Sequence, residues 1–349
     1  MTRHPLDGVY AAALTPLNSA SAPDTSTSLS TSLEAVAPYL AFLAARGCHG
    51  ALIFGTTGEG PSFSPDERGA VWQTAVRIRE EFPDFRLLAG TGTPSLTETI
   101  DLTRAAFDLG FNGAVVLPPY YFRKATDNGL FQWFREVIQK AVPADGHLLG
   151  YHFPGAAGIG FSLELLARLK DAFPVQFAGI KDSSHDPDFA RALGGRFGSD
   201  LAVFSGTDSE FTLALENHAA GCITAPANLI SPDLREVYDL FRAGKDTSAA
   251  QTRVTKQRHL LEKYPPFPPT LKALVHRLHG FPRWPVRPPL EEMGKEAEEM
   301  LVHEMSRVRF PGLARQGRQL KGAVTSQMSW SDSQPRRGER IVDRDVVHP

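Results

Sequence analysis

The chain has 349 residues and a formal net charge of -2 at pH 7, a length that suits one large α/β domain with an appendage, or two domains. The balance of acids and bases gives no global signal for nucleic acid or an anionic membrane, no apolar run reaches the roughly 18 residues of a membrane span, and Met1–Gly8 lacks the apolar core of a signal peptide. The two cysteines, Cys48 and Cys222, are too few for a disulfide framework or a zinc site and fit a reducing compartment, so we expect a cytoplasmic protein.

Eight short apolar runs recur through the first two-thirds of the chain, with amphipathic stretches between them. This alternation predicts parallel strands joined by crossover helices. Eight such units match a (β/α)8 TIM barrel of the α/β class better than an open doubly wound sheet, because no glycine fingerprint follows the first strand. The predicted strands cover residues 9–17, 50–55, 86–92, 113–119, 147–154, 177–182, 202–208 and 221–228. The predicted barrel helices cover residues 33–46, 65–81, 96–109, 130–141, 163–173, 187–197 and 210–220.

The pattern changes twice beyond the first strand. Residues 19–32 are rich in Ser, Thr and Ala and predict a loop before the first helix. After Pro232 the pattern is helical, with predicted helices at 234–242, 248–263, 269–279 and 290–307. We therefore predict a catalytic barrel over 1–232, a C-terminal helical region over 233–310, and a disordered tail over 311–349, where few apolar residues remain.

Lys181 is the first charge after the apolar run of the sixth predicted strand. An ammonium group at the end of a buried strand is poorly solvated, which favours the neutral and nucleophilic amine. Taken alone, this segment fits a lysine that caps a strand and extends to water better than a lysine that forms a Schiff base. The Schiff-base explanation becomes the better one once the ends of the other strands are considered, because the loops there build the active site of such a barrel. Thr56 follows the second strand, Tyr121 follows the fourth and Tyr151 lies in the fifth, and they add the hydroxyl groups of a carbonyl-chemistry site on the same face.

The turn from Gly55 to Gly60 ends the second strand. It lacks the Lys-Ser/Thr pair of a P-loop and follows the second strand rather than the first, which disfavours a dinucleotide site. Backbone N–H groups and hydroxyls at a strand-to-helix turn can bind one carboxylate. The carboxylate of a 2-oxo acid whose ketone meets Lys181 fits this turn.

Tyr151 and His152, in the fifth predicted strand, each have a structural explanation. Tyr151 is either a core tyrosine or the group that moves protons at the substrate oxygen. His152 is a pocket-lining or core histidine, because no second ligand stands at metal spacing. The sequence contains no HExxH motif and no Cys/His cluster, so we predict no metal site.

Several motifs in this order and spacing resemble the dihydrodipicolinate synthase / N-acetylneuraminate lyase family over about residues 5 to 300. They are Thr56-Thr57-Gly58-Glu59, Tyr151-x-x-Pro154, Gly179-Ile180-Lys181-Asp182-Ser183, Gly206-Thr207-Asp208 and Val286-Arg287-Pro288-Pro289-Leu290. This family consists of class I, Schiff-base aldolases on a (β/α)8 barrel with a C-terminal helical region, usually homotetramers built as a dimer of dimers. The resemblance implies that no cofactor is needed, because the imine itself withdraws electrons from the reacting carbon.

The resemblance also implies a role for each matching residue. Lys181 would form the imine with pyruvate or a pyruvoyl substrate, and Tyr151 would be the general acid and base. Thr56 and Tyr121 would relay its proton, with Tyr121 reaching across a dimer interface. The remaining substrate-binding residues would be Thr57 and Gly55 around the pyruvate carboxylate, and Gly206 and Ile223 along the pocket.

The chain departs from the family pattern next to the tyrosine. The family's lysine-pathway synthase has an arginine five residues after the tyrosine, where this chain has Ala156, and a methyl group does not replace a bidentate carboxylate clamp. The family's usual Asn or Ser after the tyrosine is His152 here, which alters the second-substrate pocket. Arg123 and Lys124, close to Tyr121, either bind a distal anion or are exposed loop charges.

These observations favour a pyruvate-dependent aldolase that cleaves or forms a 4-hydroxy-2-oxo acid through Lys181. Its partners would be small molecules, with no nucleic acid and no membrane. Three alternatives stay open: a hydro-lyase or dihydrodipicolinate synthase-type condensation through the same imine, a non-catalytic binding or regulatory member of the family, and a nucleotide-binding oxidoreductase.

Overall fold

The computed structural model of the chain describes residues 4–18 and 30–308. The tail predicted over 311–349 and most of the loop predicted over 19–32 lie outside these residues. None of the described helices is long and apolar enough to cross a lipid bilayer.

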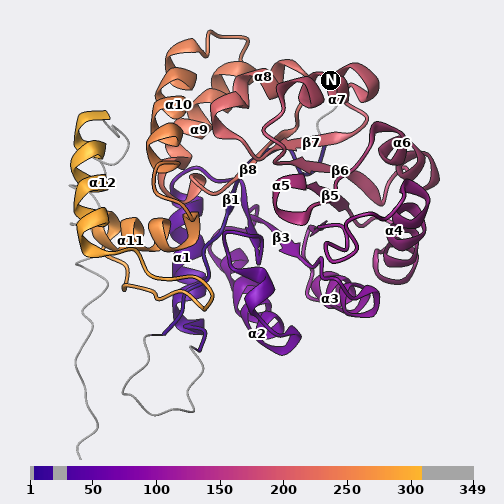
Figure 1. Cartoon of the computed structure of the whole chain (residues 1–349), viewed down its shortest axis with the longest axis horizontal. Helices are drawn as coiled ribbons and strands as arrows, with labels where there is room; N and C mark the ends of the chain where they lie inside the picture. Colours follow the sequence, from indigo (N-terminus) through magenta and orange to yellow (C-terminus); the bar gives the residue numbers. More distant parts are fainter. Residues whose placement is uncertain (1–3, 19–29, 309–349) are drawn as a thin grey trace, which may run out of the picture.

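Eight parallel strands close into a barrel in which every strand pairs with its neighbours in the chain, and β8 pairs with β1 (Figure 1). This confirms the predicted (β/α)8 TIM barrel. The strands are β1 (Gly8–Ala12), β2 (Gly50–Ile53), β3 (Arg86–Gly90), β4 (Gly113–Val116), β5 (Leu148–His152), β6 (Phe177–Asp182), β7 (Ala202–Ser205) and β8 (Gly221–Thr224). Each begins within one residue of its predicted start, but only β6 ends where predicted. The apolar runs continue past the other strands into loops whose side chains stay buried, as Leu14 and Leu17 do after β1.

The helices around the barrel are α1 (Leu33–Ala45), α2 (Pro65–Ala75), α3 (Leu96–Asp108), α4 (Asp127–Ala141), α5 (Pro154–Ala157), α6 (Leu163–Ala172), α7 (Pro187–Phe197), α8 (Phe211–Glu216) and α9 (Ala227–Arg242). In the described part of the chain they are joined by three 3-10 turns, η1 (Gly60–Ser62), η2 (Val76–Glu80) and η3 (Asp208–Glu210). Hydroxyl or carboxylate side chains cap the N-termini of α2, α3, α4, α6 and α7, namely Ser64, Ser95, Thr126, Ser162 and Asp186. These caps explain why most helix starts follow from the sequence. The short α5 was not predicted, because its four residues carry no periodic apolar pattern.

Within the residues that the structure describes, three more helices follow the barrel: α10 (Ser248–Leu261), α11 (Phe267–His279) and α12 (Lys295–Val308). They gather on one side of the molecule, where α10 and α11 pack on α9, and α12 packs on α10 and α11 (Figure 1). The domain boundary predicted after Pro232 falls inside α9, which departs from helical backbone angles at Ile230. One apolar core therefore continues from the barrel helices into α10, α11 and α12.

Side chains inside the barrel form a core of their own. Alternate strand residues such as Tyr10, Leu52, Leu149 and Ile223 fill this interior, while the residues between them pack under the helices. This two-sided burial explains the continuous apolar runs of the sequence. Because the strands are parallel, all their carboxyl ends open on one face, where the candidate site lies.

Candidate active site

A register shift in β6 turns Lys181 toward the barrel interior. The pairing of β6 with β5 slips by one residue at Ala178, which packs inside the barrel. Ile180 then faces the helices, and Lys181 pairs with Tyr151, which also packs inside. Strand side chains alternate between the two faces, so an unshifted strand with Ala178 inside would direct Lys181 at the helices. The additional residue therefore decides where the amine points.

Two glycines allow the close contacts that surround this lysine. A Cβ on Gly179 would lie 1.9 Å from the carbonyl oxygen of Ala202 on β7. The N–H of Gly206 donates to the Asp182 carbonyl at 2.6 Å, and a Cβ there would lie 2.0 Å from Ser183 Oγ. Only glycine fits either position without moving the strands apart.

The amine of Lys181 lies against the ring of Tyr151. Lys181 is 3% exposed, and its Nζ is 4.1 Å from the centre of that ring. No carboxylate in the described part of the chain forms a salt bridge with it. A buried amine without an acidic partner, next to a phenol, is a group that can act as a nucleophile toward a carbonyl.

Tyr151 connects the lysine to the turn after β2. Its hydroxyl lies 3.4 Å from Thr56 Oγ1, and either atom can be the donor. This distance is longer than a typical hydroxyl–hydroxyl hydrogen bond, and catalytic hydrogen bonds often tighten when substrate binds. Lys181 of β6, Tyr151 of β5 and Thr56 of the turn after β2 therefore come together, as the order of the strands predicts.

The predicted substrate-binding residues lie around the same end of the barrel. Gly55 and Thr57 are buried in the turn after β2. Gly206 follows β7, and Ile223 of β8 is fully buried inside the barrel. The turn, the β7 loop and β8 thus lie around the barrel interior into which Lys181 extends.

Tyr121 is the predicted site residue that the structure places elsewhere. It is 76% exposed in the loop after β4 and packs edge-on against Phe122, which is 67% exposed. Within the described residues its hydroxyl has no hydrogen bond to Tyr151 or Thr56. One chain by itself therefore does not assemble the predicted proton relay.

His152 is a core histidine rather than a pocket-lining one. Its ring stacks on Phe189 of α7 with 4.4 Å between ring centres, and its Nδ1 accepts a hydrogen bond from the Phe161 N–H at 2.9 Å. Burial lowers the pKa of His152 to about 4, so the imidazole is neutral at physiological pH. The ring lies between β5 and α7, so the prediction that it changes the second-substrate pocket is wrong. Ala156, which stands on α5 where the family's synthase has its arginine, is exposed.

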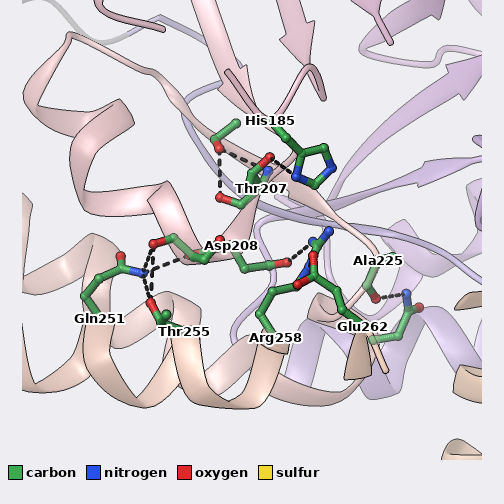
Figure 2. Close-up of polar contacts among 11 residues, drawn as sticks. His185, Thr207, Asp208, Ala225, Gln251, Thr255, Arg258 and Glu262 are labelled. Carbon is green, nitrogen blue, oxygen red and sulfur yellow. Dashed lines mark hydrogen bonds and ion pairs between the residues drawn. The ribbon is translucent and has the colours of Figure 1, made fainter. Parts of the chain in front are cut away.

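The residues that hold the loops of the site do not follow from the sequence. Lys272 of α11 pairs with Glu59 of the β2 turn at 2.5 Å, across 213 residues of sequence. Arg258 of α10 pairs with the fully buried Asp208 of the β7 loop at 2.7 Å, and also with Glu262 (Figure 2). No local pattern marks these cations, because their partners lie far away in the sequence. Among the described residues, no group of three or more His, Cys, Asp or Glu side chains is arranged to hold a metal ion.

Comparisons with known proteins find similar chains over most of the length of this one. Residues 5–308 match the model of the dihydrodipicolinate synthetase family. A Chloroflexus aurantiacus protein described as an uncharacterized DapA-like lyase is 36% identical over 289 residues, which cover 83% of this chain and 92% of that protein. A 4-hydroxy-tetrahydrodipicolinate synthase of Prochlorococcus marinus is 31% identical over 77% of this chain and 87% of its own. The solved structure of a chloride-inhibited dihydrodipicolinate synthase from Acinetobacter baumannii, complexed with pyruvate, aligns with a TM-score of 0.76 at 25% identity, over 86% of this chain and 98% of that one.

Proposed function

The chain belongs to the dihydrodipicolinate synthetase family, and on this basis we propose that it is a class I pyruvate-dependent aldolase that cleaves or forms a 4-hydroxy-2-oxo acid through Lys181. The observation that carries the proposal is the buried amine of Lys181, which lies on the interior side of β6, 4.1 Å from the centre of the Tyr151 ring. A relative whose solved structure is complexed with pyruvate supports pyruvate as the shared substrate portion.

In the cleavage direction, the amine of Lys181 attacks the C2 ketone. The hydroxyl formed at C2 takes up the phenol proton of Tyr151 and leaves as water, so that a protonated imine and a Tyr151 phenolate remain. Tyr151 then removes the proton of the C4 hydroxyl, directly or through Thr56. The C3–C4 bond breaks, an aldehyde leaves, and the bonding electrons move into the imine to form an enamine. Protonation at C3 and hydrolysis release pyruvate and restore the free amine. No metal or organic cofactor takes part in these steps.

The turn after β2 would hold the carboxylate of the substrate. Its buried Thr57, its exposed Thr56 hydroxyl and the backbone N–H groups around Gly55 provide donors at a strand-to-helix turn. A carboxylate fixed here places the adjacent C2 ketone toward the strand ends, where Lys181 lies. Binding and chemistry would thus occupy opposite sides of the same end of the barrel, the first after β2 and the second on β6.

One observation favours a second candidate, the condensation of pyruvate with an aldehyde that carries its own carboxylate. Ala156 of α5 has no donor for such a group. The side chain of Arg123, however, lies against Gly158 at the end of α5, where a Cβ would come within 2.6 Å of its Cδ. A guanidinium at this point can bind a distal carboxylate in place of a residue on α5 itself.

A substrate panel distinguishes these candidates. We expect the purified protein to release pyruvate from at least one 4-hydroxy-2-oxo acid among compounds whose aldehyde portion is apolar, hydroxylated or carboxylated. Pyruvate is measured with lactate dehydrogenase and NADH. Faster condensation with a carboxylated aldehyde than any cleavage would favour the second candidate. Absence of turnover together with saturable NAD binding would instead support an oxidoreductase, and absence of both would support a binding protein.

We also propose that Tyr121 completes the site of a neighbouring subunit in a homotetramer. Its exposure of 76%, next to the similarly exposed Phe122, supports this arrangement. We expect Tyr121→Phe and Lys181→Ala homomers to be nearly inactive, and activity to return when the two are mixed after dissociation. Each mixed dimer would contain one site with both native residues. If mixing restores nothing while size measurements show mixed oligomers, Tyr121 does not act across the interface.

The remaining parts of the proposal concern compartment and organisation. The free and buried thiols of Cys48 and Cys222 support a reducing, cytoplasmic location. The residues up to 232 would provide the chemistry, and the helical region from 233 to 310 would support it.

A further inference from the structure

A buried ion pair joins the C-terminal helical region to the turn after β2. Lys272, on α11, is 1% exposed, and Glu59, in the turn, is 3% exposed. Lys272 Nζ lies 2.5 Å from Glu59 Oε1 and also donates to the carbonyl of Pro285 at 2.6 Å. Burial lowers the pKa of Lys272, while the Glu59 carboxylate opposes this shift. The lysine is thus held by two oxygens, one of them on the turn.

Glu59 is fixed from several directions. Its second carboxylate oxygen, Oε2, accepts a hydrogen bond from the backbone N–H of Arg287 at 2.8 Å. Its backbone has a φ of 58°, in the left-handed region that few non-glycine residues adopt. Such a conformation persists when the surroundings determine it. The contacts with Lys272 and Arg287 supply those surroundings.

The conformation of Glu59 is transmitted directly to the predicted carboxylate site. The backbone N–H of Glu59 donates to the carbonyl of Thr56 at 3.1 Å and closes the turn that contains Thr57. The N–H of Gly60 closes a wider turn on the Gly55 carbonyl at 3.2 Å. A change at Glu59 therefore moves the hydroxyl and N–H groups of the Thr56–Thr57 segment.

We infer that Lys272 is a positioning residue, which through Glu59 holds the Thr56–Thr57 segment in the conformation that binds the carboxylate of the 2-oxo acid. This inference rests on the proposed function. Simple stabilisation explains the pair poorly, because a buried ion pair replaced by neutral groups of similar volume often costs little stability. The effect of the pair on the position of the binding groups can be much larger, because a displacement of about 1 Å at a positioning group can lower activity by about 100-fold.

The test separates folding from positioning. Lys272→Met alone leaves the Glu59 carboxylate buried without its cation and is expected to destabilise the fold strongly. The double variant Lys272→Met/Glu59→Gln removes both charges and keeps an amide oxygen that can accept from the Arg287 N–H. We expect it to unfold cooperatively near the native Tm. The pyruvate concentration that gives half-maximal borohydride trapping should nevertheless rise by about 10- to 100-fold, with a smaller change in kcat.

Arg253→Met/Asp233→Asn is the matched control, because this pair lies in the same helical region, 3.2 Å apart and away from the turn. Its half-maximal pyruvate concentration should stay native. An unchanged value in the folded Lys272→Met/Glu59→Gln variant overturns the inference. Glu59→Gln alone, which keeps Lys272 bonded to Pro285, carries the same expectation if the double variant does not fold. Failure of the native protein to be trapped at all would overturn the proposed function instead.

Discussion

The Lys181→Ala variant is expected to lose borohydride-trapped pyruvate entirely and to lose turnover by on the order of 10⁴-fold or more, the scale that follows removal of a covalent nucleophile. The reason is chemical: borohydride reduces an imine to a stable secondary amine, and no other described group is placed to form that imine. The native protein should gain the mass of one reduced pyruvate per chain, which intact-protein mass spectrometry measures. Peptide mapping should find this mass on the peptide that contains Lys181.

Two controls make the result specific. Lys245→Ala, at an exposed position after α9, should trap pyruvate like the native protein. The Lys181→Ala variant should keep a cooperative thermal transition, because Ala also fits the interior side of β6. If an adduct persists in the folded Lys181→Ala variant, another amine reacts and the mechanism is wrong.

The Tyr151→Phe variant is expected to lower kcat by about 10²- to 10⁴-fold, the usual contribution of a positioned general acid and base. It should still trap pyruvate at long incubation times. Phe keeps the aromatic ring on which the Lys181 amine lies, so the geometry of the lysine is retained. The lost hydroxyl is the group that lies 3.4 Å from Thr56. Steady-state kinetics and the extent of trapping, measured on the same samples, separate the two effects.

Tyr10→Phe is the matched control for this variant. Tyr10 is also buried inside the barrel, but its hydroxyl donates to the Leu6 carbonyl at 2.7 Å, outside the proposed relay. Its loss should lower thermal stability and leave kcat nearly native. If Tyr151→Phe lowers kcat by less than about tenfold, or if both variants behave alike, Tyr151 is a structural tyrosine.

Much of the fold follows from local patterns. The starts of the strands could be predicted within one residue because buried parallel strands need continuous apolar runs. Most helix starts could be predicted because capping side chains satisfy the first N–H groups. The ends of all the strands except β6 were predicted too late, since many residues of the loops at the carboxyl face are themselves apolar and buried. Local pattern does not separate a buried strand from a buried loop.

The candidate site divides in the same way. Strand order and the rule that parallel strands open on one face were enough to predict that Lys181, Tyr151 and Thr56 meet. The order of the strands does not by itself predict the direction in which a side chain points. His152 follows Tyr151 in an apolar run, yet its ring lies between β5 and α7. The exposure of Tyr121 depends on how the loop after β4 packs, and the apolar periodicity of the sequence does not predict the packing of a loop.

The sequence by itself determined the succession of strands and helices, and therefore which residues reach the open end of the barrel. These features depend on side chains within a few positions of one another. Only the tertiary structure decided that Lys181 points inward, because a single additional residue in β6 reverses its face. Only the tertiary structure brought Lys272 to Glu59, since an ion pair depends on distance in space and these partners are 213 residues apart in the chain.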